Sequence, residues 1–174
     1  MNFQELYNNH KNLVFNLALQ YVQNIEDAEE ITQDVFVTIY WKLKSFRNES
    51  KITTWIYRIT INKSLDFIKS KARKKRFAFF TSLFYNETEE FKHDVSDFNH
   101  PGILLEQKEE LKKIFRFINE LPDNQKTTLI LMKIECKTQK EVAEIMNISN
   151  KAVESLLQRA KHNLSKKLNS NKGK

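Results

Sequence analysis

The sequence has few of the residues that interrupt helices, and few of the cysteines that cross-link small secreted folds. It contains two glycines, two prolines and one cysteine among 174 residues. Because glycine and proline break helices, while the frequent lysine, glutamate, leucine and isoleucine favour them, this composition predicts an all-α fold class. The lone Cys136 excludes an internal disulfide bond and cannot hold a zinc ion by itself.

Long apolar runs and targeting patterns are also absent from the sequence. No stretch approaches the roughly 20 apolar residues that a membrane span requires. The N-terminus shows no signal-peptide pattern. These absences predict a cytoplasmic protein without membrane insertion.

The residue patterns typical of enzymes are missing, so we expect no enzymatic activity, no metal site and no cofactor. There is no glycine-rich phosphate loop and no nucleophile motif. Glu29, Glu30 and Asp34 could bind a divalent ion, but acids near a helix start are more simply explained by the helix dipole. The four histidines are scattered without metal-ligand spacing: His10, His93, His100 and His162.

Charge divides the chain into two basic lobes. The formal net charge is +7, which suggests an anionic partner such as nucleic acid. Residues 1–76 carry 13 basic and 8 acidic residues, and residues 106–174 carry 15 and 9, whereas residues 77–105 carry one lysine and five acids. We therefore predict two small helical domains, 1–76 and 106–168, joined by a linker, 77–105, and followed by a basic tail, 169–174.

Apolar spacing predicts seven helices in these two domains. Asn24 is the expected N-cap of the second helix, and Pro122 suits the first turn of the fifth. The linker has six phenylalanines, so we expect it to lie on a surface. The predicted helices span about residues 1–22, 24–44, 53–76, 104–119, 122–134, 138–146 and 149–168.

The C-terminal domain carries the signature of a helix-turn-helix. Thr138 and Glu141 have the spacing of a capping box. Asn147 tolerates a left-handed turn, and Ser149 can cap the following helix. Ala143 is small enough to let two helices cross closely, and the apolar positions around it have the register of a shared core.

One side of the last helix is polar and has the chemistry to read DNA. An exposed helix face is usually only solvated, but behind a helix-turn-helix this face enters the major groove. Gln158 can pair with adenine, Arg159 with guanine or phosphate, and Glu154 with a cytosine amine, while Lys151 and Lys161 suit phosphates. The predicted DNA-reading residues are Asn150, Lys151, Glu154, Ser155, Gln158, Arg159 and His162.

The N-terminal domain has two polar stripes at helical spacing. Glu30, Gln33, Asp34, Val37 and Trp41 share one side of the second helix, which suggests a docking face for a positively charged protein. The third helix carries a second stripe beside Trp55 and continues into six positive charges within residues 69–76. That combination is typical of a surface for a nucleic-acid backbone and unstacked bases.

These motifs together resemble a known family. Asp27-Ala28-Glu29-Glu30-Ile31-Thr32-Gln33-Asp34-Val35-Phe36, then Phe46-Arg47, then Thr54-Trp55-Ile56-Tyr57-Arg58-Ile59 with Asn62 and Asp66, resemble region two of the extracytoplasmic-function (ECF) sigma factors of bacterial RNA polymerase. Residues 121–161 resemble region four. Two departures concern the helix-turn-helix: Glu154 replaces a positive charge, and Asn147 stands where glycine is common.

The resemblance implies partners and residue roles. The partners would be core RNA polymerase (its beta-prime clamp helices and beta flap), promoter DNA and an anti-sigma factor. The second-helix stripe Glu30, Gln33, Asp34, Val37 and Trp41 would bind core, and the polar face of the last helix would read the minus-thirty-five element. The minus-ten element would be captured by Arg47, Asn48, Glu49, Ser50, Lys51, Thr54, Trp55, Arg58 and Asn62.

Two other interpretations compete with a sigma factor. A stand-alone regulator could use the same helix-turn-helix on duplex DNA, although it would leave the N-terminal stripes without a role. A helical adaptor that never touches DNA conflicts with the two basic lobes.

Overall fold

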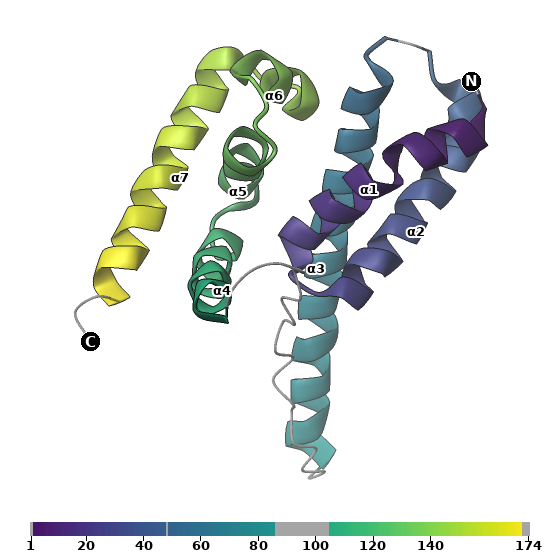
Figure 1. Ribbon diagram of the computed structural model, residues 1–174. Helices are drawn as coiled ribbons and strands as arrows, with labels where there is room; N and C mark the ends of the chain where they lie inside the picture. Colours follow the sequence, from purple (N-terminus) through teal and green to yellow (C-terminus); the bar gives the residue numbers. More distant parts are fainter. Residues whose placement is uncertain (1, 48, 86–104, 172–174) are drawn as a thin grey trace.

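The computed structural model describes residues 2–47, 49–85 and 105–171, and every regular element in them is helical. The all-α fold class and its two helical domains are confirmed (Figure 1). Most of the expected linker, the end of the expected tail and Asn48 lie outside the described residues. The helices are α1 Phe3–Val22, α2 Ile25–Lys42, α3 Ile52–Tyr85, α4 Leu105–Asn119, α5 Asp123–Leu129, α6 Gln139–Met146 and α7 Asn150–Asn171, with a 3-10 turn at Leu43–Ser45 and a π turn at Ile130–Ile134.

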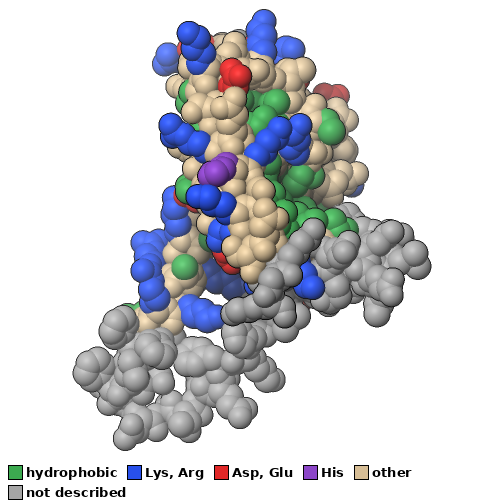
Figure 2. Space-filling view, turned by 90° about the vertical axis from the view of Figure 1, so that its left-hand side faces the viewer, with side chains coloured by type: hydrophobic (Ala, Val, Ile, Leu, Met, Phe, Trp, Pro, Cys, Tyr) green, Lys and Arg blue, Asp and Glu red, His purple; other side chains and the backbone are tan. Residues whose placement is uncertain are grey.

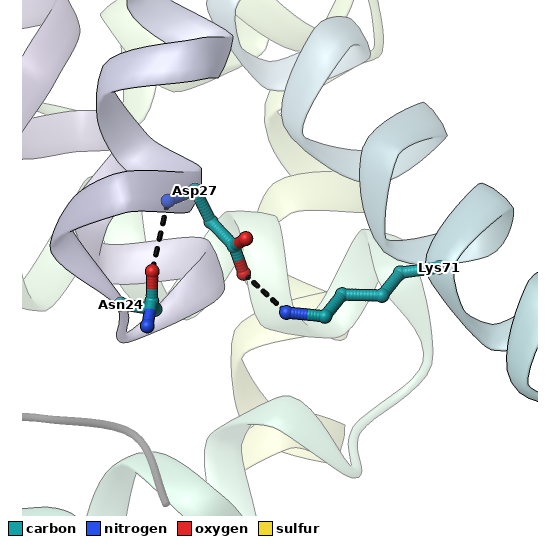
Figure 3. A network of polar contacts seen from close by, with 3 residues as sticks. All are labelled: Asn24, Asp27 and Lys71. Atoms are coloured by element: carbon teal, nitrogen blue, oxygen red, sulfur yellow. Dashed lines mark hydrogen bonds and ion pairs between the residues drawn. The ribbon is translucent and has the colours of Figure 1, made fainter. Parts of the chain in front are cut away.

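Helices α1, α2 and α3 pack around an apolar core at the N-terminal end of the chain. Val14, Val35, Ile39 and Ile56 are fully buried there. The expected N-cap is confirmed, because the Asn24 side chain accepts a hydrogen bond from the Asp27 amide at 2.8 Å. Asp27 also forms an ion pair of 2.8 Å with Lys71 of α3 (Figure 3). The start of α2 is thereby fixed against the middle of α3.

Helix α3 is longer than its sequence pattern suggested. It continues to Tyr85, past the end expected near Arg76. The nine residues from 77 to 85 contain neither glycine nor proline, so nothing in them stops a helix. The C-terminal half of α3 consequently extends below the three-helix core (Figure 1).

The capping box and the turn of the helix-turn-helix are confirmed. The Thr138 side chain accepts from the Glu141 amide, and the Glu141 carboxylate accepts from the Thr138 amide. Asn147 adopts the left-handed conformation with φ of 53°. Ser149 Oγ accepts from the Ala152 amide at 3.2 Å, which caps α7.

The predicted helix over residues 122–134 consists of α5 and a single π turn. The Glu135 amide donates to the Ile130 carbonyl at 3.0 Å, and the Lys137 amide donates to the Leu131 carbonyl at 2.9 Å. Between them, Cys136 has φ of 52°, which is unfavourable for a cysteine and is usual only for glycine, asparagine and aspartate. The π turn and this left-handed residue end the helix and turn the Glu135 side chain out of it.

The two domains share a second apolar core. Leu17, Tyr21, Tyr57 and Ile61 of the N-terminal domain are buried in one cluster with residues of the C-terminal domain: Ile118, Leu121, Leu129, Ile130, Leu131, Val142, Ile145, Val153 and Ala160. Helix α3 contacts α6 at this core. We call this packing of the two domains against each other the closed arrangement.

Among the described helices, none is both long and apolar enough to cross a membrane.

The left-handed turn at Asn147 leads to a stability prediction. For alanine the left-handed conformation costs about 1–2 kcal/mol. Glycine adopts the same conformation without this cost. We expect Asn147→Ala to lower the free energy of unfolding by about 1 kcal/mol and Asn147→Gly to leave it nearly unchanged. Urea unfolding followed by circular dichroism measures both. Equal losses in the two variants would contradict the role given to the left-handed turn.

Candidate nucleic-acid interface

The polar face of α7 is open to solvent in the closed arrangement. Six of the seven residues predicted to read DNA are exposed and Ser155 is half-buried. The opposite side of α7 is anchored by Val153 and Ala160, which are both buried. Lysines and arginines gather around a histidine on the surface over α7 (Figure 2). The arrangement offers a basic, polar helix face of the kind that enters a major groove.

Helix α6 fixes the orientation of this polar face. Gln139 Nε2 donates to the Asn150 carbonyl at 2.7 Å, which joins the starts of α6 and α7. The capping box holds the start of α6, and its hydrogen bonds from the Thr138 amide and hydroxyl lower the pKa of the Glu141 carboxyl. The two helices of the motif are therefore tied together by polar contacts and by the shared apolar core.

The stripe on α2 is fully accessible. Glu30, Gln33, Asp34, Val37 and Trp41 are all exposed. Val37 and Trp41 show 56% and 75% of their surface, which is high for a valine and a tryptophan in a folded domain. Asp34 makes only a loose ion pair of 3.8 Å with Lys63 of α3. The stripe combines acidic residues with exposed apolar side chains, a composition suited to binding a protein partner.

The segment before α3 presents polar side chains beside an aromatic pair. Arg47, Glu49 and Lys51 are exposed, and Ser50 is half-buried. The rings of Phe46 and Trp55 lie 4.9 Å apart at an angle of 36°. Aromatic rings at such a position can support an unstacked base.

The predicted minus-ten residues on α3 have three different environments. Asn62 is exposed, whereas Thr54 is buried in the closed arrangement. Arg58 reaches the C-terminal domain: its Nη2 donates to the Glu144 carbonyl at 2.5 Å and its Nε donates to the Ile145 carbonyl at 3.1 Å. The structure thus leaves part of the predicted minus-ten surface open and covers the part around Arg58.

A charged groove of about 1050 Å³ runs between α2 and α3. Acids of α2 line one wall, among them Asp27 and Glu30, and the basic stretch of α3 lines the other. Lys71 pairs with Asp27, and Lys69 pairs with Asp123 of α5 at 2.9 Å. The last four cations of this stretch, residues 73–76, are exposed and extend the positive surface of α3 away from the core.

A polar cluster between the two domains escaped the sequence analysis. The Glu135 carboxylate accepts hydrogen bonds from Tyr57 Oη at 2.7 Å and from Gln20 Nε2 at 2.5 Å. Lys137 Nζ lies 4.9 Å from the centre of the Tyr57 ring. We name these four residues the Glu135 contact. Glu135 is 78 positions from Tyr57 and 115 positions from Gln20 in the sequence. No local sequence signal could therefore have identified this cluster.

Both tyrosines between the domains have a raised pKa. Burial raises the pKa of Tyr57, and its hydrogen bond to the Glu135 carboxylate raises it further. Burial also raises the pKa of Tyr21, whose hydroxyl donates to Thr127 Oγ1 at 3.0 Å. Each hydroxyl is therefore kept protonated while the domains stay in contact.

Within the described part of the chain, no three histidine, cysteine, aspartate or glutamate side chains are grouped so as to hold a metal ion.

Comparison with known proteins accounts for both domains. The family model for sigma-70 region 2 matches residues 6–74, and the model for sigma-70 region 4 matches residues 111–164. The chain belongs to the ECF sigma factors. It is 28% identical over 169 residues to the ECF RNA polymerase sigma factor SigW of Bacillus subtilis, a match that covers 95% of this chain and 88% of SigW. It is 26% identical to the ECF RNA polymerase sigma-E factor of Escherichia coli, with 95% and 86% covered.

Two solved structures share the fold of this ECF chain. CnrH, in complex with the cytosolic domain of CnrY, matches with a TM-score of 0.66 at 21% identity, covering 97% of this chain and 88% of CnrH. The sigma factor RpoE of Bartonella quintana, in complex with the anti-sigma factor NepR, matches with a TM-score of 0.64 at 20% identity, covering 96% of each chain.

The raised pKa values of the tyrosines generate a pH prediction. A tyrosine whose pKa is higher in the folded chain stabilises it fully below the unfolded value of about 10. That stability is lost as the pH rises above this value, by up to about 1.4 kcal/mol per pH unit for each tyrosine. We expect the melting temperature to fall more steeply between about pH 9.5 and 11 in the native chain than in a Tyr57→Phe variant. Parallel curves for the two proteins would show that Tyr57 is not held protonated.

Proposed function

We propose that this ECF sigma factor divides its task among three surfaces. The stripe on α2 binds the beta-prime clamp helices of core RNA polymerase. The segment before α3 and the first turns of α3 capture the melted minus-ten element, and the polar face of α7 reads the minus-thirty-five element as duplex. Residues 1–76 and 106–168 are the two working domains, with residues 77–105 as linker and 169–174 as basic tail.

The observation that carries this proposal is the exposed stripe on α2. A protein that only bound duplex DNA would have no use for exposed side chains at Val37 and Trp41, because exposed apolar groups of this size favour aggregation. Aromatic side chains are enriched where protein partners dock. Glu30 and Asp34 beside them favour a positively charged partner surface.

The minus-ten assignment is supported by an aromatic pair flanked by cations. Flipping a base out of the duplex costs a few kcal/mol, which stacking and hydrogen bonds must return. Phe46 and Trp55 offer ring faces for stacking, and exposed Arg47 and Lys51 can hold the phosphates. The cations at residues 73–76 extend the positive surface along α3, which rises by about 1.5 Å per residue. We expect them to bind phosphates of DNA that is still duplex.

The remaining partners follow from the same division of surfaces. We propose that the C-terminal domain contacts the beta flap of core. We also propose that an anti-sigma factor inhibits the chain, a proposal supported by the complex of the sigma factor RpoE with the anti-sigma factor NepR. The chain would act by binding alone, without catalysis or a cofactor, and in the cytoplasm where polymerase and promoters are found.

The decisive functional experiment is transcription in vitro. Core polymerase is incubated with this chain and a pool of genomic fragments, and the 5′ ends of the transcripts are sequenced. The proposal predicts starts that depend on the chain and share two upstream elements. A stand-alone helix-turn-helix regulator would instead bind duplex fragments without core and give no chain-dependent starts from core alone.

Reversing a charge on the α2 stripe tests the polymerase-binding surface. Asp34→Lys should weaken binding to purified core at least tenfold, because a repulsive charge then faces a positive partner. Its stability should change by less than about 0.5 kcal/mol, since Asp34 is exposed and its ion pair is loose. Glu5→Lys makes the same charge change at an exposed position of α1. This variant is the matched control and should bind core normally. If both variants bind equally well, the stripe is not the docking surface.

Two kinds of substitution on α7 separate base reading from phosphate binding. Gln158→Ala or Arg159→Ala should relax sequence preference at the upstream element by about 1–3 kcal/mol of discrimination. Lys151→Ala should weaken binding to all sequences alike and reduce the salt dependence by about one ion. Selection of promoters from a randomised pool by the reconstituted holoenzyme measures both effects. An unchanged upstream preference in the Gln158 and Arg159 variants would contradict the assigned reading face.

A further inference from the structure

A pocket of about 320 Å³ lies where the end of α1, the start of α2 and α3 meet α4 and α5. Sites for small molecules typically have volumes of about 300–1,000 Å³, so this pocket has room for a small metabolite. One part of its lining is apolar and consists of Val22, Phe67, Ile68 and Ala72. None of the residues predicted to bind core polymerase or to contact promoter bases lines it.

Lys126 of α5 lines this pocket with a buried side chain. Only 3% of its surface is exposed. Within the described residues its ammonium has neither a hydrogen bond nor an ion pair, because nearby Asp123 is paired with Lys69 at 2.9 Å. Burial accordingly lowers the pKa of the Lys126 ammonium. A buried cation without a direct partner is costly, and an anion in the pocket would remove that cost.

Two further lysines line the same pocket from α3. Lys71 and Lys75 are four residues apart and therefore share one side of the helix. Lys71 is paired with Asp27 of α2 at 2.8 Å (Figure 3), and Asp27 is the one acid among the lining residues. With Lys126, three cations thus stand against one acid. The excess of two positive charges matches a phosphate monoester, which carries nearly two negative charges at neutral pH.

The lining also holds a polar atom that a phosphate cannot satisfy. Asn119 Oδ1, at the end of α4, is buried and has no hydrogen-bond partner in the described part of the chain. A carbonyl oxygen of this kind needs a donor, and a doubly charged phosphate offers none. A ligand with a hydroxyl or N–H group beside its phosphate would satisfy both Asn119 and the lysines. The apolar part of the lining would cover the rest of such a molecule.

We propose that this pocket binds a phosphate monoester whose organic part carries a hydroxyl or N–H donor, a class that includes sugar phosphates and nucleoside monophosphates. Lys126, Lys71 and Lys75 hold the phosphate, and Asn119 accepts from the organic part. The inference does not depend on the proposed function.

The ligand would contact both domains at once, because Lys126 and Asn119 belong to the C-terminal domain and the other lining residues to the N-terminal domain. Binding would therefore stabilise the closed arrangement, and the melting temperature should rise with ligand concentration. By linkage, any partner that separates the domains would weaken the binding of this ligand.

The test is isothermal titration calorimetry of the full-length chain with four probes: adenosine 5′-monophosphate, glucose 6-phosphate, inorganic phosphate and adenosine. Lys126→Met removes the buried charge but keeps an apolar side chain of similar length. Lys133→Met makes the same charge change at an exposed position of the same domain, away from the pocket, and is the matched control. Lys75→Ala alters the pocket at an exposed position, so it tests the site without disturbing a buried side chain.

We expect at least one of the two esters to bind with a stoichiometry of one, and about tenfold more tightly than inorganic phosphate or adenosine. Lys126→Met should weaken this binding by about tenfold, Lys75→Ala should weaken it less, and Lys133→Met should leave it unchanged. The ester that binds more tightly identifies the organic part.

Three results would overturn the inference. Neither ester binds more tightly than inorganic phosphate and adenosine, or the Lys126 and Lys133 variants lose affinity equally. In the third, a mixed-sequence DNA duplex displaces the bound ester, which would show that these lysines hold phosphates of DNA.

Discussion

The Glu135 carboxylate is the interaction on which the closed structure depends. It lies at the end of a π turn in the C-terminal domain and accepts hydrogen bonds from Tyr57 of α3 and Gln20 of α1. Around it the two domains bury a common apolar core that includes Tyr21 and Ile61 from one side and Ile130 and Leu131 from the other. An apolar core alone would favour contact without fixing its geometry. The carboxylate, the hydrogen bond from Tyr21 to Thr127 and the ion pair of Lys69 with Asp123 fix how the domains are aligned. In this alignment the end of α6 lies against Arg58.

This geometry divides the surface of an ECF sigma factor into parts that are available and parts that are not. The stripe on α2 and the polar face of α7 are exposed, so the docking and the duplex reading proposed for them would need no rearrangement. The start of α3 is engaged, because Arg58 is bound to backbone carbonyls of the C-terminal domain. The chain is thus compact and still exposes the two surfaces proposed for core polymerase and for duplex DNA.

Features of the structure could be predicted from the sequence where the interacting residues are close together in the chain. The capping box at Thr138, the N-cap at Asn24 and the left-handed Asn147 involve neighbours in the chain, and all three were predictable. The exposure of the α2 stripe and the α7 face followed from helical spacing. A helical wheel shows which residues share a face, however, and cannot show whether another domain covers that face. For this reason the sequence could not distinguish Arg58 from Asn62, and it carried no signal at Glu135.

One distance measurement tests most directly whether the chain alternates between closed and polymerase-bound arrangements. Spin labels are placed at exposed positions of the two domains through Lys11→Cys and Lys166→Cys, with the native Cys136 replaced by serine. Double electron–electron resonance is recorded for the free chain and after addition of core. A narrow distance distribution that moves to longer values with core is the predicted result. The same short distance in a holoenzyme that actively transcribes would contradict the account in which the two domains separate when the chain binds core.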